Sequence, residues 1–236
     1  MQFTFDYIKN ELMCIINNGY RFLTCQEAFI DFIATGTVNN GQKSIVNRVD
    51  VDFSLKKAVV LAEIFNELGI TATFFVRLHA KEYNVFDFEN FLCLRKIKDL
   101  GFEIGLHSEV VDQSVIWNEN PVVCLKRDIR ILETIIDDRL YGVASHGSHT
   151  GLNNLDFWKN HKPDDFNLKY ETYLHGLFEA SLYISDSCWT YWKSYLKGKS
   201  LLSDLRSPSE HSFDEFPLMY LLTHPDTYYH THPYES

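Results

Sequence analysis

The sequence predicts an α/β protein whose parallel strands form a sheet that is either open or closed into a barrel. Short β-branched runs alternate with amphipathic stretches of helical length, an order that builds right-handed crossover units. The chain has 236 residues, 45% of them hydrophobic, and it shows no repeat or low-complexity segment. Both properties are typical of one globular domain with a sizeable core.

Residues 1–43 precede the regular part of this pattern. Isoleucine and leucine recur at helical spacing over residues 6–18, which predicts a first helix. The segment RFLTCQEAF then predicts a short strand followed by a helix, with Thr24 and Glu27 at the spacing of a capping box. A turn-rich connector over residues 35–43 completes the segment.

From residue 44 onward, strands and helices alternate. The run 44–52 predicts a strand, and Ser54 is the predicted cap of a helix that ends at Gly69. Further strands are predicted at residues 70–76, 102–107, 141–146, 181–185 and 217–224. Further helices are predicted at residues 87–100 and 122–136.

Composition limits the partners of the chain. Thirty-two acidic and 22 basic residues give a net charge of −10, which repels nucleic-acid phosphates and anionic lipid. The five cysteines are isolated and never spaced as C-x-x-C, which argues against a disulfide framework and a four-sulfur zinc site. Asp6 and Glu11 stand where a secretion signal carries positive charge, and no apolar run approaches the roughly 18 residues of a membrane span. We therefore expect a cytoplasmic protein with no membrane span and no nucleic-acid partner.

Polar residues that a hydrophobic core would not select stand at the ends of four predicted strands: Asp50 and Asp52, His107, His146, and His224. The carboxyl ends of parallel strands meet at one edge of the sheet, so these side chains are expected to converge. One carboxylate and two imidazoles bind a divalent transition metal and leave positions open for water and substrate. Alternation points the two aspartates to the same side, one to bind metal and one to take a proton from water. The set predicts metal-assisted hydrolysis.

Several segments between residues 44 and 226 resemble, in order, the motifs of one enzyme family: RVDVD, ITATFFV, LGFEIGLHSE, SHGSHTGLNNLDFW, ISDSCW and LLTHPD. They resemble the NodB-homology polysaccharide deacetylases (carbohydrate esterase family 4), and most of all a divergent, intracellular-looking branch with a His-Gly-Ser motif. The resemblance implies the distorted (β/α)7 barrel of that family and removal of the N-acetyl group from a sugar or glycan precursor. It also implies one catalytic domain over residues 1–236, with residues 1–43 as a helical extension packed on the barrel.

The resemblance assigns roles to individual residues. It implies that Asp50 is the catalytic base, that Asp52 and His107 bind a divalent metal, with zinc as the expected ion, and that His224 is the general acid. Asp186, in ISDSCW, is expected to hold His224 in its charged form.

Substrate contacts are assigned to Trp189, Glu109 and Asn153, although Asn153 is also a good helix cap. The expected substrate is a small-molecule or lipid-linked N-acetylated sugar.

Two departures from the family pattern leave alternatives open. The usual second motif, H-S-x-x-H, supplies two metal-binding histidines, but the segment that begins at His107 reads HSEVV. His146 is the first choice for the missing ligand and Glu109 the second, with His149 and Asp112 as weaker choices. The third motif, whose arginine holds the base, is absent, so the residue that orients the base is not assigned.

Two other functions fit parts of the pattern. Two histidines and one carboxylate also describe non-haem iron oxygenases, but those usually have an all-β fold. A sugar-binding barrel that has lost its metal and its activity is the main alternative, and the incomplete second motif is its motivation.

Overall fold

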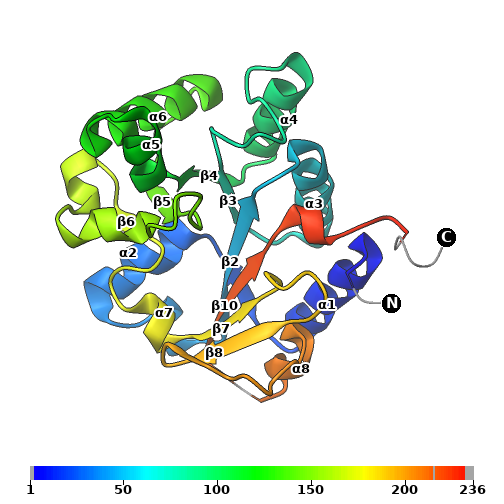
Figure 1. Cartoon of the computed structure of the whole chain (residues 1–236). Helices are drawn as coiled ribbons and strands as arrows, with labels where there is room; N and C mark the ends of the chain where they lie inside the picture. The colour runs from blue at the N-terminus through cyan, green and yellow to red at the C-terminus, as the bar shows by residue number, and fades with distance from the viewer. Residues whose placement is uncertain (1–2, 215, 232–236) are drawn as a thin grey trace.

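The protein is described by a computed structural model covering residues 3–214 and 216–231 (Figure 1). Its strands are β1 (Arg21–Leu23), β2 (Ser44–Val51), β3 (Thr73–Val76), β4 (Glu103–Ser108), β5 (Gly142–Ser145), β6 (Tyr170–Glu171), β7 (Leu182–Ser185), β8 (Lys193–Leu196), β9 (Lys199–Ser200) and β10 (Leu218–Thr223). Its α-helices are α1 (Phe5–Asn17), α2 (Cys25–Thr35), α3 (Leu55–Leu68), α4 (Phe88–Asp99), α5 (Val110–Trp117), α6 (Pro121–Ile136), α7 (Leu177–Ala180) and α8 (Pro208–Ser212). Its 3-10 turns are η1 (Asn39–Gly41), η2 (Asn154–Lys159), η3 (Pro163–Phe166) and η4 (Pro225–Thr227).

One sheet contains all the strands of the described residues. The strands follow the order β6-β5-β4-β3-β2-β10-β7-β8-β9, and β1 pairs with the start of β2. All pairs from β6 to β7 are parallel, whereas β8 and β9 are antiparallel additions. Strand β2 is central because it pairs with β10 along one edge and with both β1 and β3 along the other. The predicted parallel α/β sheet is therefore confirmed.

The sheet curls around an interior cluster of side chains. Buried residues from strands along the sheet meet in this cluster: Val46, Phe75, Ala144, Tyr170, Tyr183, Tyr220 and Leu222. Residues that lie far apart in the strand order can share one cluster only if the sheet bends into a barrel. Tyr173, just after β6, and Tyr195 of β8 both contact the ring of Phe178, so aromatic packing bridges the two ends of the sheet.

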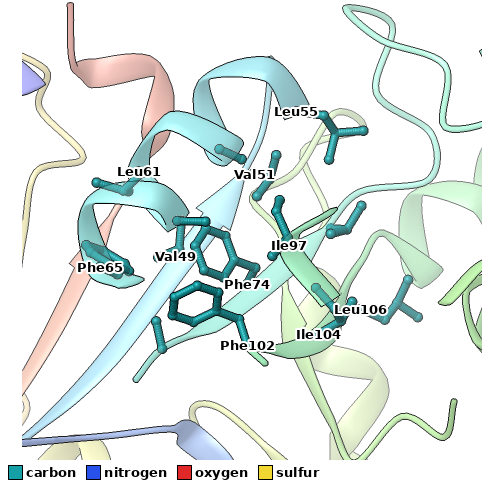
Figure 2. Close-up of a cluster of buried hydrophobic side chains, with 14 of the residues drawn as sticks. Val49, Val51, Leu55, Leu61, Phe65, Phe74, Ile97, Phe102, Ile104 and Leu106 are labelled. Atoms are coloured by element: carbon teal, nitrogen blue, oxygen red, sulfur yellow. The ribbon is translucent and has the colours of Figure 1, made fainter. Parts of the chain in front are cut away.

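The outer face of the sheet is covered by helices, which surround the strands in Figure 1. Figure 2 shows Val49 and Phe74, two outward-facing strand residues, beside Leu61 and Phe65 of α3, and Ile104 of β4 belongs to the same buried cluster. Alternation along β2 thus sends Val49 into the outer layer, whereas the residues on either side of it face the interior.

Helix α2 closes the amino end of the barrel. The backbone nitrogen of Cys25 donates to Thr73 Oγ1 at the start of β3, and that of Gln26 donates to Glu103 Oε2 at the start of β4. The predicted capping box of Thr24 and Glu27 is confirmed. Residues 3–43, expected as a helical extension packed on the barrel, therefore also contribute a strand to the sheet and a helix to its end.

The predicted elements between residues 44 and 145 have the expected type, with Ser54 and Gly69 as the caps of α3. Helix α5 was not predicted because its own N-cap residue, Glu109, makes no capping hydrogen bond. Its first turn is capped instead by Asn154, whose Oδ1 accepts from two backbone nitrogens of α5. The short elements β6, β8, β9, α7 and α8 were also missed, since each is too short for a periodicity to emerge.

Among the described residues, no helix combines the length and the apolar character needed to cross a membrane.

Phe29 of α2 is fully buried and its ring stacks on Tyr170 at a centroid distance of 4.7 Å. Phe29→Ala should lower the free energy of unfolding by about 3–5 kcal/mol, because it opens a cavity at the closed end of the barrel. Ile30→Ala, on the exposed side of the same helix, is the control and should change it by no more than about 0.5 kcal/mol. Equal losses in urea denaturation would contradict the assignment of α2 as the barrel's end cap.

Candidate active site

Asp50 is held in the barrel by a buried arginine two residues before it on β2. Arg48 donates from Nε to Asp50 Oδ1 at 2.8 Å and from Nη2 to Oδ2 at 2.7 Å, and it also donates to Thr172 Oγ1 at 3.0 Å. Arg48 is 1% exposed and Asp50 is 2% exposed. Burial alone would raise the pKa of Asp50, but the Arg48 guanidinium and the nearby His107 ring hold it well below its usual range. Asp50 is therefore an ionised carboxylate, fixed by two hydrogen bonds to one planar group.

Asp52, His107 and His146 meet at the carboxyl ends of β2, β4 and β5. Asp52 Oδ1 lies 3.4 Å from His107 Nε2 and 3.7 Å from His146 Nε2. One ligand atom from each of the three residues lies within 4.8 Å of the others. The buried Asp52 Oδ1 has no hydrogen-bond partner among the described residues. An orphaned carboxylate oxygen facing two imidazole nitrogens is the donor set of a divalent transition metal, so these residues fit the expected ion.

The main chain of the neighbouring strand β5 fixes the orientation of the His107 ring. Its Nδ1 donates to the carbonyl oxygen of Ala144 on the neighbouring strand at 2.9 Å, which leaves Nε2 facing Asp50 Oδ2 at 3.2 Å and Asp52 Oδ1 at 3.4 Å. Burial lowers the pKa of His107, which favours the neutral ring that binds metal.

His224 and Asp186 form a second pair on the other side of Asp52. The buried Asp186 accepts from His224 Nδ1 at 2.6 Å and from its backbone nitrogen at 2.9 Å. His224 Nε2 lies 3.9 Å from Asp52 Oδ2. Burial alone would lower the pKa of His224, but the Asp186 carboxylate raises it to about 9. His224 is therefore a protonated imidazole at neutral pH, with Nε2 directed toward the site.

One cavity of about 520 Å³ is lined by aromatic residues from the seam of the barrel and by Asp50, Asp52, His107, His146 and His224. Trp189 is 44% exposed at its rim, and its ring lies 5.6 Å from that of Phe53. Tyr173, Phe178 and Tyr195 form the opposite, half-buried wall. The cavity thus joins charged groups to apolar ring faces, a combination suited to a sugar with an acyl substituent.

A larger cavity of about 820 Å³ lies at the amino end of the strands. Its ionic side chains pair with one another, for example Arg21 with Glu27 and Lys98 with Asp138. The cavity at the carboxyl ends of the strands is therefore the better candidate for chemistry.

The remaining predicted site residues lie outside the cavity lining. Glu109 is buried and ion-paired with Arg77 at 2.8 Å. Asn153 is exposed, and its Oδ1 accepts from the backbone nitrogen of Leu155, so it caps η2. Asp112, considered as a weaker ligand, accepts hydrogen bonds from His149, Thr150 and Asn154 and fixes the loop after β5.

Sequence reasoning missed two arginines. Arg48 was not assigned, although residues two apart on a strand share a face and the pairing with Asp50 could be expected from that rule. Arg77 directly follows β3 and is buried, so the search for polar residues at strand ends could have found it.

No protein-family model matches the sequence, and no curated protein matches it either. Solved structures are similar. The deacetylase PplD of Streptococcus pyogenes, solved in complex with acetate, has a TM-score of 0.52 at 16% identity over 70% of each chain. The polysaccharide deacetylase Bc1974 of Bacillus cereus has a TM-score of 0.47 at 16% identity, over 78% of this chain and 80% of that chain. BA3943 of Bacillus anthracis, a CE4 family pseudoenzyme, has 0.47 at 15% identity, over 78% of this chain and 55% of that chain.

The similarity to PplD shows the fold, since structures at this level of identity share architecture and not necessarily activity. The chain has the distorted (β/α)7 barrel of the NodB-type polysaccharide deacetylases, as its motifs predicted.

Removal of the Arg48 guanidinium should destabilise the protein strongly. Arg48→Met removes both hydrogen bonds and the guanidinium charge from the buried Asp50 carboxylate, which should lower the free energy of unfolding by about 3–5 kcal/mol. The double variant Arg48→Met with Asp50→Asn removes the unpaired charge and should lose less than the single variant. Urea denaturation of the variants checks this, and a single variant as stable as the wild type would contradict the structural role of the ion pair.

Proposed function

We propose that this chain is a metal-dependent deacetylase that hydrolyses the N-acetyl group of a sugar or glycan precursor. The observation that carries the proposal is that Asp50, the Asp52–His107–His146 group and His224 line one cavity, with the buried Asp186 hydrogen-bonded to His224 Nδ1. The deacetylase fold supports the reaction class.

Asp52, His107 and His146 would hold the metal, with zinc as the expected ion because two imidazoles and a carboxylate suit it. When bound, such an ion polarises a carbonyl oxygen and lowers the pKa of water from 15.7 to about 7. One observation supports this assignment: Asp52 Oδ1 is buried and makes no hydrogen bond among the described residues.

The chain's own residues would move the protons. Asp50 is ionised and fixed by Arg48, so it can take a proton from the attacking water. His224, protonated at Nδ1 by its bond to Asp186, carries a second proton on Nε2 that it can give to the departing amine. The pKa of the base Asp50 is lowered and the pKa of the acid His224 is raised. Amide hydrolysis needs such a pair, with one group ready to accept a proton and the other ready to donate one.

The substrate follows from the cavity and from the fold. A volume of about 520 Å³ is ample for a monosaccharide, and Trp189 offers a ring face for a sugar or for an acetyl methyl group. A small-molecule or lipid-linked N-acetylated sugar stays our prediction, as do the cytoplasmic location and the absence of a nucleic-acid partner.

The first test is metal-dependent release of acetate from a panel of N-acetylated sugars and sugar nucleotides. Wild-type protein should lose activity on chelation and regain it with Zn²⁺ or Co²⁺. Asp50→Asn should lower kcat by about 10²–10⁴-fold, the usual contribution of a positioned base.

Asp156→Asn is the matched control, because Asp156 is an exposed carboxylate outside the cavity lining, and it should keep wild-type activity. Sugar binding without acetate release, in protein that takes up no metal, would favour the sugar-binding barrel that has lost its metal and its activity. Oxygen-dependent turnover with iron would favour the oxygenase alternative.

The second test is the pH dependence of kcat/KM. His224 donates a proton only while protonated, so activity should fall as the pH rises past about 9. Asp186→Asn removes the carboxylate that raises this pKa, and the fall should move to lower pH, toward the ordinary histidine value of about 6.5. Identical alkaline limits in wild type and variant would contradict the assignment of His224 as the acid.

A further inference from the structure

Behind His146 lies a buried ionic cluster that takes no part in the proposed proton transfers. Glu109 Oε1 lies 2.8 Å from Arg77 Nη2, 3.0 Å from His149 Nε2 and 3.4 Å from His146 Nδ1. Glu109 is 3% exposed and Arg77 is 2% exposed. Burying two ionised groups this deeply carries a large desolvation penalty, which is offset only if they pair with each other or hydrogen-bond to other groups.

The two histidines of the candidate metal centre have the same orientation relative to Asp52. Each directs Nε2 toward Asp52 Oδ1, at 3.4 Å for His107 and 3.7 Å for His146. His107 Nδ1 donates a hydrogen bond to the Ala144 carbonyl oxygen, whereas the buried His146 Nδ1 makes no hydrogen bond among the described residues and lies 3.4 Å from Glu109 Oε1. A proton held on Nδ1 by such an acceptor leaves the Nε2 lone pair free for a metal.

Arg77 ties this cluster to the metal centre. It donates from Nη1 to the carbonyl oxygen of Asp52 at 3.3 Å and from Nη2 to Glu109 Oε1. The ion pair with the buried Arg77 guanidinium favours the charged form of the Glu109 carboxylate. Glu109 is therefore a charged acceptor at a fixed place between β3, β4 and the loop after β5.

We infer that Glu109, held by Arg77, is a positioning residue that turns His146 so that its Nε2 serves as the metal ligand missing from the second motif. The inference rests on the proposed function. It replaces the earlier expectation that Glu109 contacts substrate or binds metal directly. Glu109 instead faces the nitrogen of His146 that points away from Asp52.

A second cation at Glu109, His146 and His149 is the competing use of the same residues, since their ligand atoms also lie within 4.8 Å of one another. Arg77 Nη2 lies 2.8 Å from Glu109 Oε1 and 2.9 Å from His149 Nε2. The guanidinium thus already supplies the positive charge at this position, and a metal ion there would be repelled by it.

The test is metal binding by the full chain, stripped with a chelator and titrated with Co²⁺ in a calorimeter. Glu109→Gln keeps an oxygen acceptor of the same shape, and Glu109→Ala removes it. Removing a residue that orients a metal ligand typically lowers metal affinity about 10–100-fold. We therefore expect Co²⁺ affinity to fall about 10-fold in Glu109→Gln and about 100-fold in Glu109→Ala. The Co²⁺ absorption bands should keep their positions, because the ligand set is unchanged.

His149→Ala is the control, since His149 contacts the same Glu109 oxygen but is 52% exposed, and its Co²⁺ affinity should equal that of the wild type. Circular dichroism of each metal-free variant distinguishes a loss of folding from a loss of metal binding. If Glu109→Ala does not fold, Glu109→Gln alone tests the inference.

Wild-type affinity in both Glu109 variants would overturn the inference, as would Co²⁺ bands that shift with loss of an oxygen ligand. Two Co²⁺ ions per chain, one of them lost in both Glu109→Ala and His149→Ala, would show a second metal site instead. A wild-type protein that binds no Co²⁺ would contradict the proposed function itself.

Discussion

The parallel pairing of β2, β4, β5 and β10 is the constraint on which the rest of the site depends. Parallel strands bring their carboxyl ends to one edge of a sheet, and the curl of the barrel then brings those ends face to face. Asp52, His107, His146 and His224 each stand at or just beyond such an end. Side chains from distant parts of the sequence therefore meet without any local motif that contains them all.

Under the proposed function, the roles of the family's motifs would be taken by residues at unusual positions in this chain. The arginine that holds the base comes from two residues earlier on the same strand, in place of a separate motif. The second histidine comes from the end of β5, in place of the turn after β4. Both replacements are geometrically possible, because residues two apart on one strand share a face and neighbouring strands of a barrel can bring side chains to the same point.

Much of the fold could be predicted because its signals are local. The caps at Ser54 and Thr24 and the aspartate pair at the end of β2 can be recognised from a few neighbouring residues. The missed features depend on contacts between distant segments. Helix α5 begins where it does because its first turn is capped by Asn154, which follows 43 and 42 residues after the two donors Val111 and Asp112. Likewise, nothing near Glu109 in the sequence indicates that its partners are Arg77 and His146, so its role could not be assigned before the strands were placed.

The most direct test of the central claim is anomalous X-ray diffraction from crystals soaked in Zn²⁺, measured at the zinc absorption edge. We predict one strong peak at about 2.0–2.2 Å from a carboxylate oxygen of Asp52 and from Nε2 of both His107 and His146. No peak among these three side chains, or a peak held by Glu109 and His149 alone, would contradict the account.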